Sequence, residues 1–190
     1  RPSKRALDVV VAGTLLALGA PLAIVVVGIC AVASVVRPHD RGPLLYRERR
    51  ISRGREFDLL KLRTLRVGVI EDVRRTGSHA RVFEADPANL TWAGRRLLKP
   101  WYLDELPQLV NVLRGEMSLV GPRPERVEHF AGLERELPWF MLRHAVPVGM
   151  TGWAQVHGLR GDACRGHVLA FGRRCHYHLH ASLRPPGRRR

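Results

Sequence analysis

One uncharged stretch near the start of the chain constrains its fold more than any other feature. Residues 9–36 read VVVAGTLLALGAPLAIVVVGICAVASVV and contain no charged side chain. As one helix these 28 residues would extend for about 42 Å, which exceeds the ~30 Å hydrocarbon core of a bilayer. The stretch is too long for a cleaved signal peptide and too uniformly apolar for a helix of a small soluble domain. It therefore predicts a membrane element.

A proline and the flanking charges bear on the topology of this stretch. Pro21 lies near its middle, where the loss of a helical hydrogen bond is expected to kink or break the helix. Basic residues flank both ends: Arg1, Lys4 and Arg5 before the stretch, and Arg37 and Arg41 after it. Because Lys and Arg mark cytoplasmic flanks, we expect both ends on one side, with a re-entrant turn at Pro21. A kinked helix that spans the bilayer is the alternative.

The net charge points to anionic partners. The 190 residues include 32 basic and 17 acidic side chains, a net charge of +15, which suits phosphorylated substrates, an anionic leaflet or nucleic acid. A coding bias toward arginine is an alternative source of this excess, since only three of the basic residues are lysines. The basic residues are spread along the chain and not interleaved with aromatics, so we expect no nucleic-acid partner. The three cysteines have no framework or metal-ligand spacing.

The remaining sequence predicts an α+β fold that is mostly helical. Leu44–Tyr46 and Phe57–Leu62 are short apolar-rich runs around Gly54, a pattern that predicts a β-hairpin. Residues 125–136 are helical in pattern, and residues 67–87 are helix or loop. The segment 138–146 combines aromatics with basic residues, so it is either an interfacial helix or a core helix.

A further helix is predicted by apolar residues at helical spacing, namely Leu106, Leu109, Val110 and Leu113. Asp104 and Glu105 precede it, and Gly115 follows its end. A helix N-terminus favours ionised carboxylates, and an ionised carboxylate can attack phosphorus or bind a divalent cation. Simple capping of the helix is the alternative.

Four cations lie in the segments around this acidic pair: Lys61, Arg63, Lys99 and Arg123. Arg123 belongs to the turn GPRP, which two prolines make rigid. A diphosphate substrate needs such cations around a nucleophile and a metal ion. The combination suggests a phosphate-handling site without identifying a reaction.

Five motifs carry a resemblance to a known family. They are KRALD (4–8), RGPLLYRERR (41–50), FDLLKLRTL (57–65), LDELPQLVNVLRGEMSLVGPRP (103–124) and VGMTGWAQVHG (148–158). In these motifs and their order, the chain resembles the bacterial sugar transferases, the monotopic polyprenyl-phosphate phosphoglycosyltransferases. The motif 103–124 is long and highly specific.

The resemblance implies a reaction. In the family, the Asp of the DE pair attacks the sugar-bearing phosphate of a UDP-sugar, UMP leaves, and polyprenyl phosphate then takes the phosphosugar from the Asp. By this likeness Asp104 is the nucleophile, and Glu105 is its catalytic partner and the Mg²⁺ ligand. The expected substrate-binding residues are Lys61, Arg63, Lys99, Arg123, Trp153 and Gln155. The family's re-entrant helix, broken near a proline, matches residues 9–36 with Pro21.

The implied organisation has three parts. We expect a re-entrant membrane anchor at 1–40, a catalytic domain with the hairpin and interfacial helices at 41–161, and a divergent basic tail at 162–190. The expected partners are a UDP-sugar donor, a polyprenyl phosphate acceptor and the lipid bilayer, with a homo-oligomeric state left open. The expected location is the bacterial cytoplasmic (inner) membrane, with the site on the cytoplasmic face, in exopolysaccharide or lipopolysaccharide synthesis.

Two departures from the family pattern stand out. Lys99 stands where the family usually has Arg, which keeps the charge but not the bidentate fork. From about Asp162 the resemblance in sequence stops, and the tail carries seven arginines and one acidic residue. The alternatives are therefore a catalytically inactive relative that binds nucleotide sugar or partner proteins, and a basic membrane-tethered protein that binds nucleic acid or anionic lipid.

Overall fold

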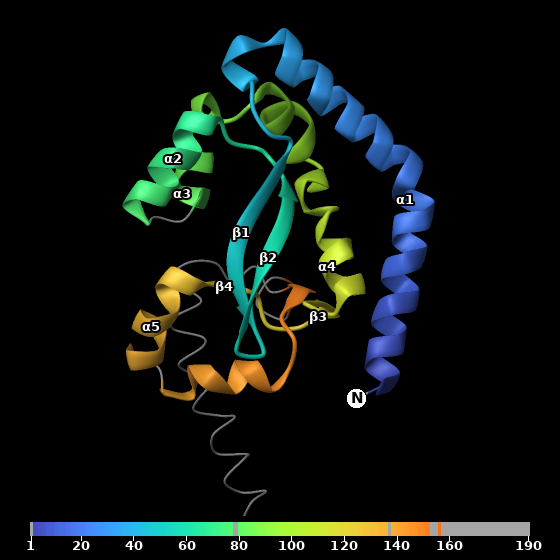
Figure 1. Cartoon of the computed structure of the whole chain (residues 1–190), viewed down its shortest axis with the longest axis vertical. Coiled ribbons are helices and arrows are strands. Elements are labelled where there is room, and N and C mark those ends of the chain that lie inside the picture. The colour runs from blue at the N-terminus through green and yellow to red at the C-terminus, as the bar shows by residue number, and fades with distance from the viewer. Residues whose placement is uncertain (1, 78–79, 137, 153–155, 157–190) are drawn as a thin grey trace, which may run out of the picture.

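The computed structural model describes residues 2–77, 80–136, 138–152 and 156. The part of the chain it describes is mostly helical, with small β-sheets and one long apolar helix at the N-terminus (Figure 1). The helices are α1 (Pro2–Val36), α2 (Val67–Thr76), α3 (Ala80–Glu84), α4 (Gln108–Arg114) and α5 (Val127–Glu136). The strands are β1 (Leu45–Ser52), β2 (Arg55–Leu62), β3 (Ser118–Val120), β4 (Glu125–Arg126) and β5 (Gly149–Thr151).

Short helical turns connect these elements. They are η1 (Pro38–Asp40), η2 (Pro87–Asn89), η4 (Leu103–Glu105) and η5 (Pro138–Ala145), which are 3₁₀ turns, and η3 (Gly94–Leu98), which is a π-helix. The helix predicted for 125–136 is confirmed as α5, although residues 125 and 126 form β4. The segment 67–87, predicted as helix or loop, contains the helices α2 and α3. The interfacial role predicted for 138–146 stays a prediction.

The N-terminal stretch forms one helix instead of two. α1 continues through Pro21, and Figure 1 shows it bending and arching over the rest of the molecule. The predicted helix-break-helix is therefore corrected to a continuous, bent helix. A single proline removes one hydrogen bond, and here both halves of the helix are held by the domain, at Ala12 and at Val26. The positions of its ends relative to a bilayer stay a prediction.

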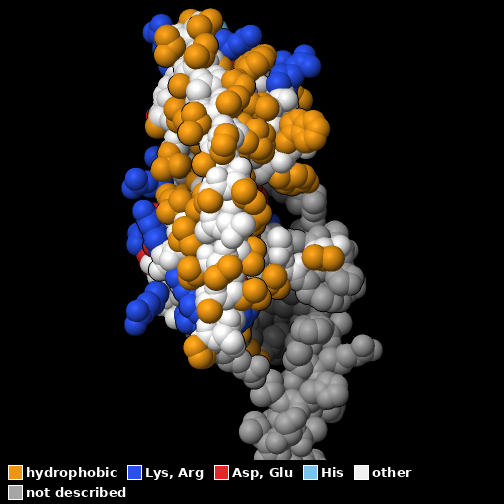
Figure 2. Space-filling model, turned by 90° about the vertical axis from the view of Figure 1, so that its right-hand side faces the viewer, with side chains coloured by type: hydrophobic (Ala, Val, Ile, Leu, Met, Phe, Trp, Pro, Cys, Tyr) orange, Lys and Arg blue, Asp and Glu red, His pale blue; other side chains and the backbone are white. Residues whose placement is uncertain are grey.

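α1 has the surface of a membrane helix. It is long and apolar enough to cross a membrane, and only 11% of its most apolar window is buried inside the molecule. Large side chains such as Leu18, Ile24 and Val35 are 77%, 73% and 74% exposed. Figure 2 shows hydrophobic side chains along this face, with Lys and Arg gathered at its upper end. Because burying such a surface is strongly favourable, this helix fits membrane association.

The β-hairpin predicted from the sequence is confirmed, and it is longer than the apolar runs indicated. β1 and β2 pair antiparallel along their whole length, from Leu45 opposite Leu62 to Ser52 opposite Arg55. Arg53 and Gly54 form the two-residue turn with φ of 51° and 74°, the left-handed conformation that tight hairpin turns require. β4 extends this sheet on the other side of β1, and β3 pairs with β5 in a separate parallel sheet.

Both ends of α1 are fastened to the domain by polar contacts. Near its start, the buried Asp8 carboxylate accepts hydrogen bonds from Ser118 Oγ (2.8 Å) and Leu119 N (3.2 Å). Arg5 Nη2 donates to the carbonyl of Leu113 (2.7 Å) at the end of α4. Near the other end of the helix, Ser34 Oγ donates to the carbonyl of Asp40 (3.2 Å). The helix is therefore attached to one folded unit at both ends.

Candidate active site

The site lies around a sharp turn that precedes α4. Asp104 and Glu105 belong to the 3₁₀ turn η4, whereas α4 begins only at Gln108, after Pro107. The two acids were predicted at the N-terminus of that helix, but they lie in a separate short turn before it. Tyr102 precedes η4 with φ of 55°, a left-handed conformation that reverses the chain. As a result Asp104 is only 2% exposed, while Tyr102 is 65% exposed.

Two lysines lie beside the acidic pair, as the sequence predicted. Lys99 Nζ lies 3.2 Å from Asp104 Oδ2, and Lys61 Nζ lies 3.8 Å from Glu105 Oε1. Lys61 comes from the end of β2, and Lys99 directly follows the π-helix η3. The structure thus brings four predicted residues together from three segments.

Close backbone packing fixes the segment that carries Lys99. A Cβ atom on Gly94 would lie 2.4 Å from the carbonyl oxygen of Thr64, so only glycine fits there. Thr91 Oγ1 accepts a hydrogen bond from Gly94 N (2.9 Å) at the same place. π-Helices of this kind often lie at functional sites. The approach at Gly94 holds η3 against the end of β2, and so sets the position of Lys99.

A third acid, Glu84 of α3, completes the charged cluster and was not foreseen. Glu84 Oε1 lies 2.7 Å from Lys99 Nζ and accepts a hydrogen bond from Thr64 Oγ1 (3.2 Å). Lys99 therefore bridges Glu84 and Asp104. No motif marks Glu84 in the sequence, because the weakly patterned segment 67–87 gives no sign of which side chain turns inward.

One carboxylate oxygen of Asp104 lacks a hydrogen bond within the described residues. Its Oδ1 atom is buried and has no hydrogen-bond partner within the described structure, an arrangement that is costly in a folded protein. Burial raises the pKa of Asp104, Lys99 and Lys61 lower it, and Glu105 raises it further, so the pKa lies above its ordinary value. The expectation that a helix terminus would favour the ionised form is corrected, because burial dominates and the lysines supply the opposing charge.

The opposite shift is found on Lys99. Burial lowers its pKa, but the charges of Asp104 and Glu84 outweigh that effect, and the pKa is raised above its ordinary value. The ammonium group therefore remains charged beside the carboxylate. A bare carboxylate oxygen flanked by fixed ammonium groups can receive a phosphorus atom or a metal ion.

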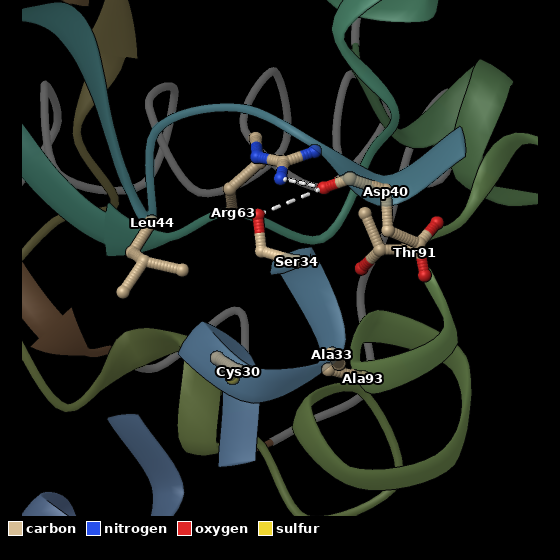
Figure 3. A pocket seen from close by; sticks show the side chains of 8 residues that line it. All are labelled: Cys30, Ala33, Ser34, Asp40, Leu44, Arg63, Thr91 and Ala93. Carbon is tan, nitrogen blue, oxygen red and sulfur yellow. Dashed lines mark hydrogen bonds between the residues drawn. The ribbon is translucent and has the colours of Figure 1, made fainter. Parts of the chain in front are cut away.

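The structure does not bring Arg63 and Arg123 to this cluster. Arg63 is buried, and its guanidinium donates to the carbonyls of Pro43 (2.6 Å), Leu65 (3.0 Å) and Asp40. Figure 3 shows Arg63 and Ser34 converging on the Asp40 carbonyl, at the small pocket beside the end of α1. Arg63 thus fastens the segment that follows α1 to the segment after β2.

The remaining predicted site residues are placed as follows. Arg123 lies in the GPRP turn with an exposed side chain, and its carbonyl accepts a hydrogen bond from Arg143. Trp153 and Gln155 lie outside the described residues, as does the tail 162–190. The substrate-binding roles stay predictions for four residues: Arg63, Arg123, Trp153 and Gln155.

The comparisons with known proteins agree with these features. The family model described as "Bacterial sugar transferase" matches residues 1–180, and the chain belongs to this family. The match continues well beyond residue 158, where the last motif ends, so the resemblance does not stop at about Asp162 as predicted. Among the predicted site residues that the structure describes, it brings together the acidic pair and two lysines, Lys61 and Lys99.

Characterised relatives cover most of this chain. A UDP-glucose:undecaprenyl-phosphate glucose-1-phosphate transferase of Caulobacter vibrioides is 40% identical over 83% of this chain and 55% of its own length. A protein of the same name from Escherichia coli is 37% identical over 84% of this chain and 32% of its own length.

A relative with a different named sugar is also similar. The UDP-N-acetylgalactosamine-undecaprenyl-phosphate N-acetylgalactosaminephosphotransferase of Aeromonas hydrophila is 33% identical over 84% of this chain and 35% of its own length. The chain thus spans between about a third and just over half the length of these relatives.

Proposed function

We propose that this chain transfers a phosphosugar from a UDP-sugar to polyprenyl phosphate, with release of UMP and through a covalent intermediate on Asp104. The observation that carries this proposal is the buried Asp104 carboxylate, which has one oxygen beside Lys99 and the other without a hydrogen-bond partner among the described residues. The names of the relatives support the donor and acceptor classes.

In the first half-reaction, a carboxylate oxygen of Asp104 forms a bond to the sugar-bearing phosphorus of the UDP-sugar. The bond between that phosphorus and the bridging oxygen breaks, and UMP leaves with the bonding electrons. A raised pKa suits this step, because a more basic carboxylate is a better nucleophile once it is ionised. Lys99, 3.2 Å from Asp104, offsets the repulsion between two approaching anions.

In the second half-reaction, a phosphate oxygen of the polyprenyl phosphate attacks the same phosphorus. The bond to the Asp104 oxygen breaks, which restores the carboxylate and gives a polyprenyl diphosphate sugar. Glu105 is positioned by Lys61 at 3.8 Å, and it lies next to the nucleophile along the chain. We assign it the removal of a proton from the acceptor phosphate when that phosphate arrives protonated.

The residues that would hold Mg²⁺ are Glu105 and the unpaired oxygen of Asp104. The described residues include no group of three His, Cys, Asp or Glu side chains able to hold a metal. This fits Mg²⁺, which proteins often hold with one or two carboxylates while the substrate phosphates supply the other ligands. Bound there, Mg²⁺ would offset the negative charge of the diphosphate.

The attachment of α1 supports a re-entrant, monotopic placement. Asp8, near the start of the helix, bonds to Ser118, and the other half of the helix packs through Val26 and Cys30 on the same folded unit. A helix whose two ends meet one folded unit places both on the same side of a bilayer, and its basic flanks place that side in the cytoplasm. The acceptor's phosphate at the headgroup level would then reach Asp104 while its tail stays in lipid.

UMP release tests the proposed reaction. The full chain in nanodiscs would receive Mg²⁺, undecaprenyl phosphate and a panel of UDP-sugars that includes UDP-glucose and UDP-N-acetylgalactosamine. Asp104→Asn is the test variant, and Asp58→Asn is the matched control, because Asp58 is an exposed acid on β2. We expect release with a particular sugar, unchanged in Asp58→Asn and absent in Asp104→Asn. Equal release from Asp104→Asn, or none from the folded wild-type protein with any sugar, would overturn the proposal.

A further inference from the structure

A second charged site lies at the C-terminal end of α1, where its exposed apolar face stops. A cleft of about 310 Å³ opens there between the end of the helix, Arg66 before α2, and the segment 87–95. The residues that line it include Val36, Arg37, Asp40, Arg66, Trp92 and Arg95. None of the charged residues around Asp104 lines this cleft, so it is separate from the proposed catalytic site.

The charges that line the cleft are unbalanced. Asp40 is the one acid among the lining residues, and it is already occupied. Its Oδ2 accepts a hydrogen bond from Trp92 N (2.8 Å), and its Oδ1 lies 3.8 Å from Arg66 Nε. Within the described part of the chain, Arg37 and Arg95 form no ion pair with a carboxylate, and both are exposed. Three guanidinium groups therefore face one carboxylate.

The walls of the cleft are already held in position. The Arg37 guanidinium lies 5.1 Å from the centre of the Trp92 ring, a cation–π contact. The Trp92 backbone is held by Asp40, which is 4% exposed. Arg66 Nε is buried and makes no hydrogen bond to any described residue. The cleft thus combines a fixed aromatic wall with guanidinium donors that have spare capacity for an anion.

The cleft lies next to the exposed apolar face of α1. Val35 and Val36, the last residues of α1, are 74% and 71% exposed, and Val36 lines the cleft. Figure 2 shows basic side chains gathered at this end of the molecule, directly beyond the apolar face. An anion with a long hydrocarbon chain could place its charge among the arginines and its chain along α1.

We propose that this cleft binds the phosphate group of an anionic membrane lipid. Arginine matches phosphate through paired N–H donors, and the Trp92 ring suits the interface between headgroups and acyl chains. The bound lipid would hold the end of α1 at the headgroup level. The ligand chemistry is a lipid-borne phosphate, carried either by a bulk phospholipid or by a polyprenyl phosphate held apart from Asp104.

The test measures lipid binding without turnover. The full chain in neutral detergent would be titrated with phosphatidylglycerol, undecaprenyl phosphate, phosphatidylcholine or inorganic phosphate, and bound lipid would be counted by native mass spectrometry. Arg37→Gln/Arg95→Gln is the test variant. Arg47→Gln/Arg55→Gln removes the same charge from exposed positions on the β-hairpin, and Asp104→Asn reports on the catalytic site.

We expect phosphatidylglycerol or undecaprenyl phosphate to bind, and the one that binds more tightly identifies the source. The dissociation constant of that lipid at this cleft should rise at least about tenfold in Arg37→Gln/Arg95→Gln and stay unchanged in the hairpin variant. Asp104→Asn should alter only the additional undecaprenyl phosphate that binds at the catalytic site. Equal weakening in both double variants, binding of phosphatidylcholine as tight as that of the anionic lipids, or binding of inorganic phosphate alone would overturn the proposal. Because no arm depends on turnover, its failure is distinct from failure of the proposed reaction.

Discussion

Two clusters of buried charge in this domain differ in how completely their acids are paired. In the first, on β1 and β4, both carboxylate oxygens of Glu48 are engaged, with Arg50 Nη2 at 2.7 Å and Arg126 Nε at 3.1 Å. In the second, Asp104 has Lys99 at one oxygen and, in the part of the chain that the structure describes, no hydrogen-bond partner at the other. Both acids are buried, so depth alone does not separate them.

The pKa directions express this difference. Burial alone would raise the pKa of Glu48, but Arg50, Lys61 and Arg126 reverse the shift and lower it. Burial also raises the pKa of Asp104, and there the lysines do not overcome it. Removing a buried acid that is fully paired leaves its partners uncompensated and lowers the stability of the fold. A buried carboxylate oxygen without a partner instead costs the fold stability and is available to a ligand. The pairing thus separates a structural cluster around Glu48 from the proposed catalytic cluster around Asp104.

The largest expected effect is on turnover. Asp104→Asn should lower the rate of UMP release by about 10³-fold or more, because the amide cannot form the covalent intermediate. The same change should leave the free energy of unfolding equal to or above that of the wild type, since it removes a buried charge with an open oxygen. Steady-state kinetics and chemical denaturation in detergent measure the two quantities. A strongly destabilised Asp104→Asn would remove the distinction between the clusters.

The reverse pattern is expected at Glu48. Glu48→Gln leaves Arg50 and Arg126 buried without their acid, so the free energy of unfolding should fall by about 3–5 kcal/mol. Denaturant titration checks this value. The exposed acid Glu56 on β2 is the matched position, since its pair with Arg49 is open to solvent. Glu56→Gln should therefore change stability far less. An equal loss of unfolding free energy in the two variants would show that the buried Glu48 cluster contributes no more to stability than the exposed pair.

A smaller effect on the rate is expected at Glu84, which holds Lys99 at 2.7 Å without contacting Asp104 in the described structure. Glu84→Gln should lower kcat by about tenfold, because Lys99 loses one of its two anchors. KM for the UDP-sugar should change little. Because Glu84 acts through Lys99, the pH profile of kcat should shift in Glu84→Gln. A lower kcat with an unmoved profile would assign Glu84 a merely structural part.

The smallest expected effect separates the clusters by pH. The lowered pKa of Glu48 means that its stabilisation is present above its unfolded pKa and is lost as the pH falls through the folded pKa. The raised pKa of Asp104 means that the folded state binds the extra proton. Its contribution therefore decreases as the pH rises from the unfolded pKa to the folded pKa.

The two variants report these signs separately. Between about pH 4 and pH 7, the stability difference between wild type and Glu48→Gln should hold or grow as the pH rises. As the pH rises over the same range, the free energy of unfolding of the wild type should fall relative to that of Asp104→Asn. Unfolding measured at several pH values provides both slopes. Slopes of the same sign would contradict the contrast between the two acids.

The elements that depend on local pattern were predictable from the sequence. Gly54 between two apolar runs indicated the hairpin, and leucines at helical spacing indicated α4 and its end at Gly115, which has φ of 84°. Lys61 and Lys99 were expected near Asp104, and the structure places them there. These features follow from periodicity, turn chemistry and motif order.

Features that depend on tertiary contacts were not predictable. Arg63 resembles the other cations in the sequence, and only the surrounding carbonyls show that it holds the segment that follows α1. Glu84 gains its part through contacts with Thr64 and Lys99, which come from distant segments. The continuity of α1 through Pro21 depends on packing at Ala12 and Val26. The raised pKa of Asp104 depends on its burial, which no local pattern reports.

In the proposed reaction, Asp104 becomes covalently bonded to the phosphosugar. The most direct measurement is the intact mass of the full chain after incubation with Mg²⁺ and the active UDP-sugar in the absence of any polyprenyl phosphate, followed by peptide mapping. We expect a mass increase equal to one phosphosugar, located on Asp104, absent in Asp104→Asn and removed when undecaprenyl phosphate is added. UMP release from an active enzyme with no adduct on Asp104, or with an adduct on another residue, would contradict it.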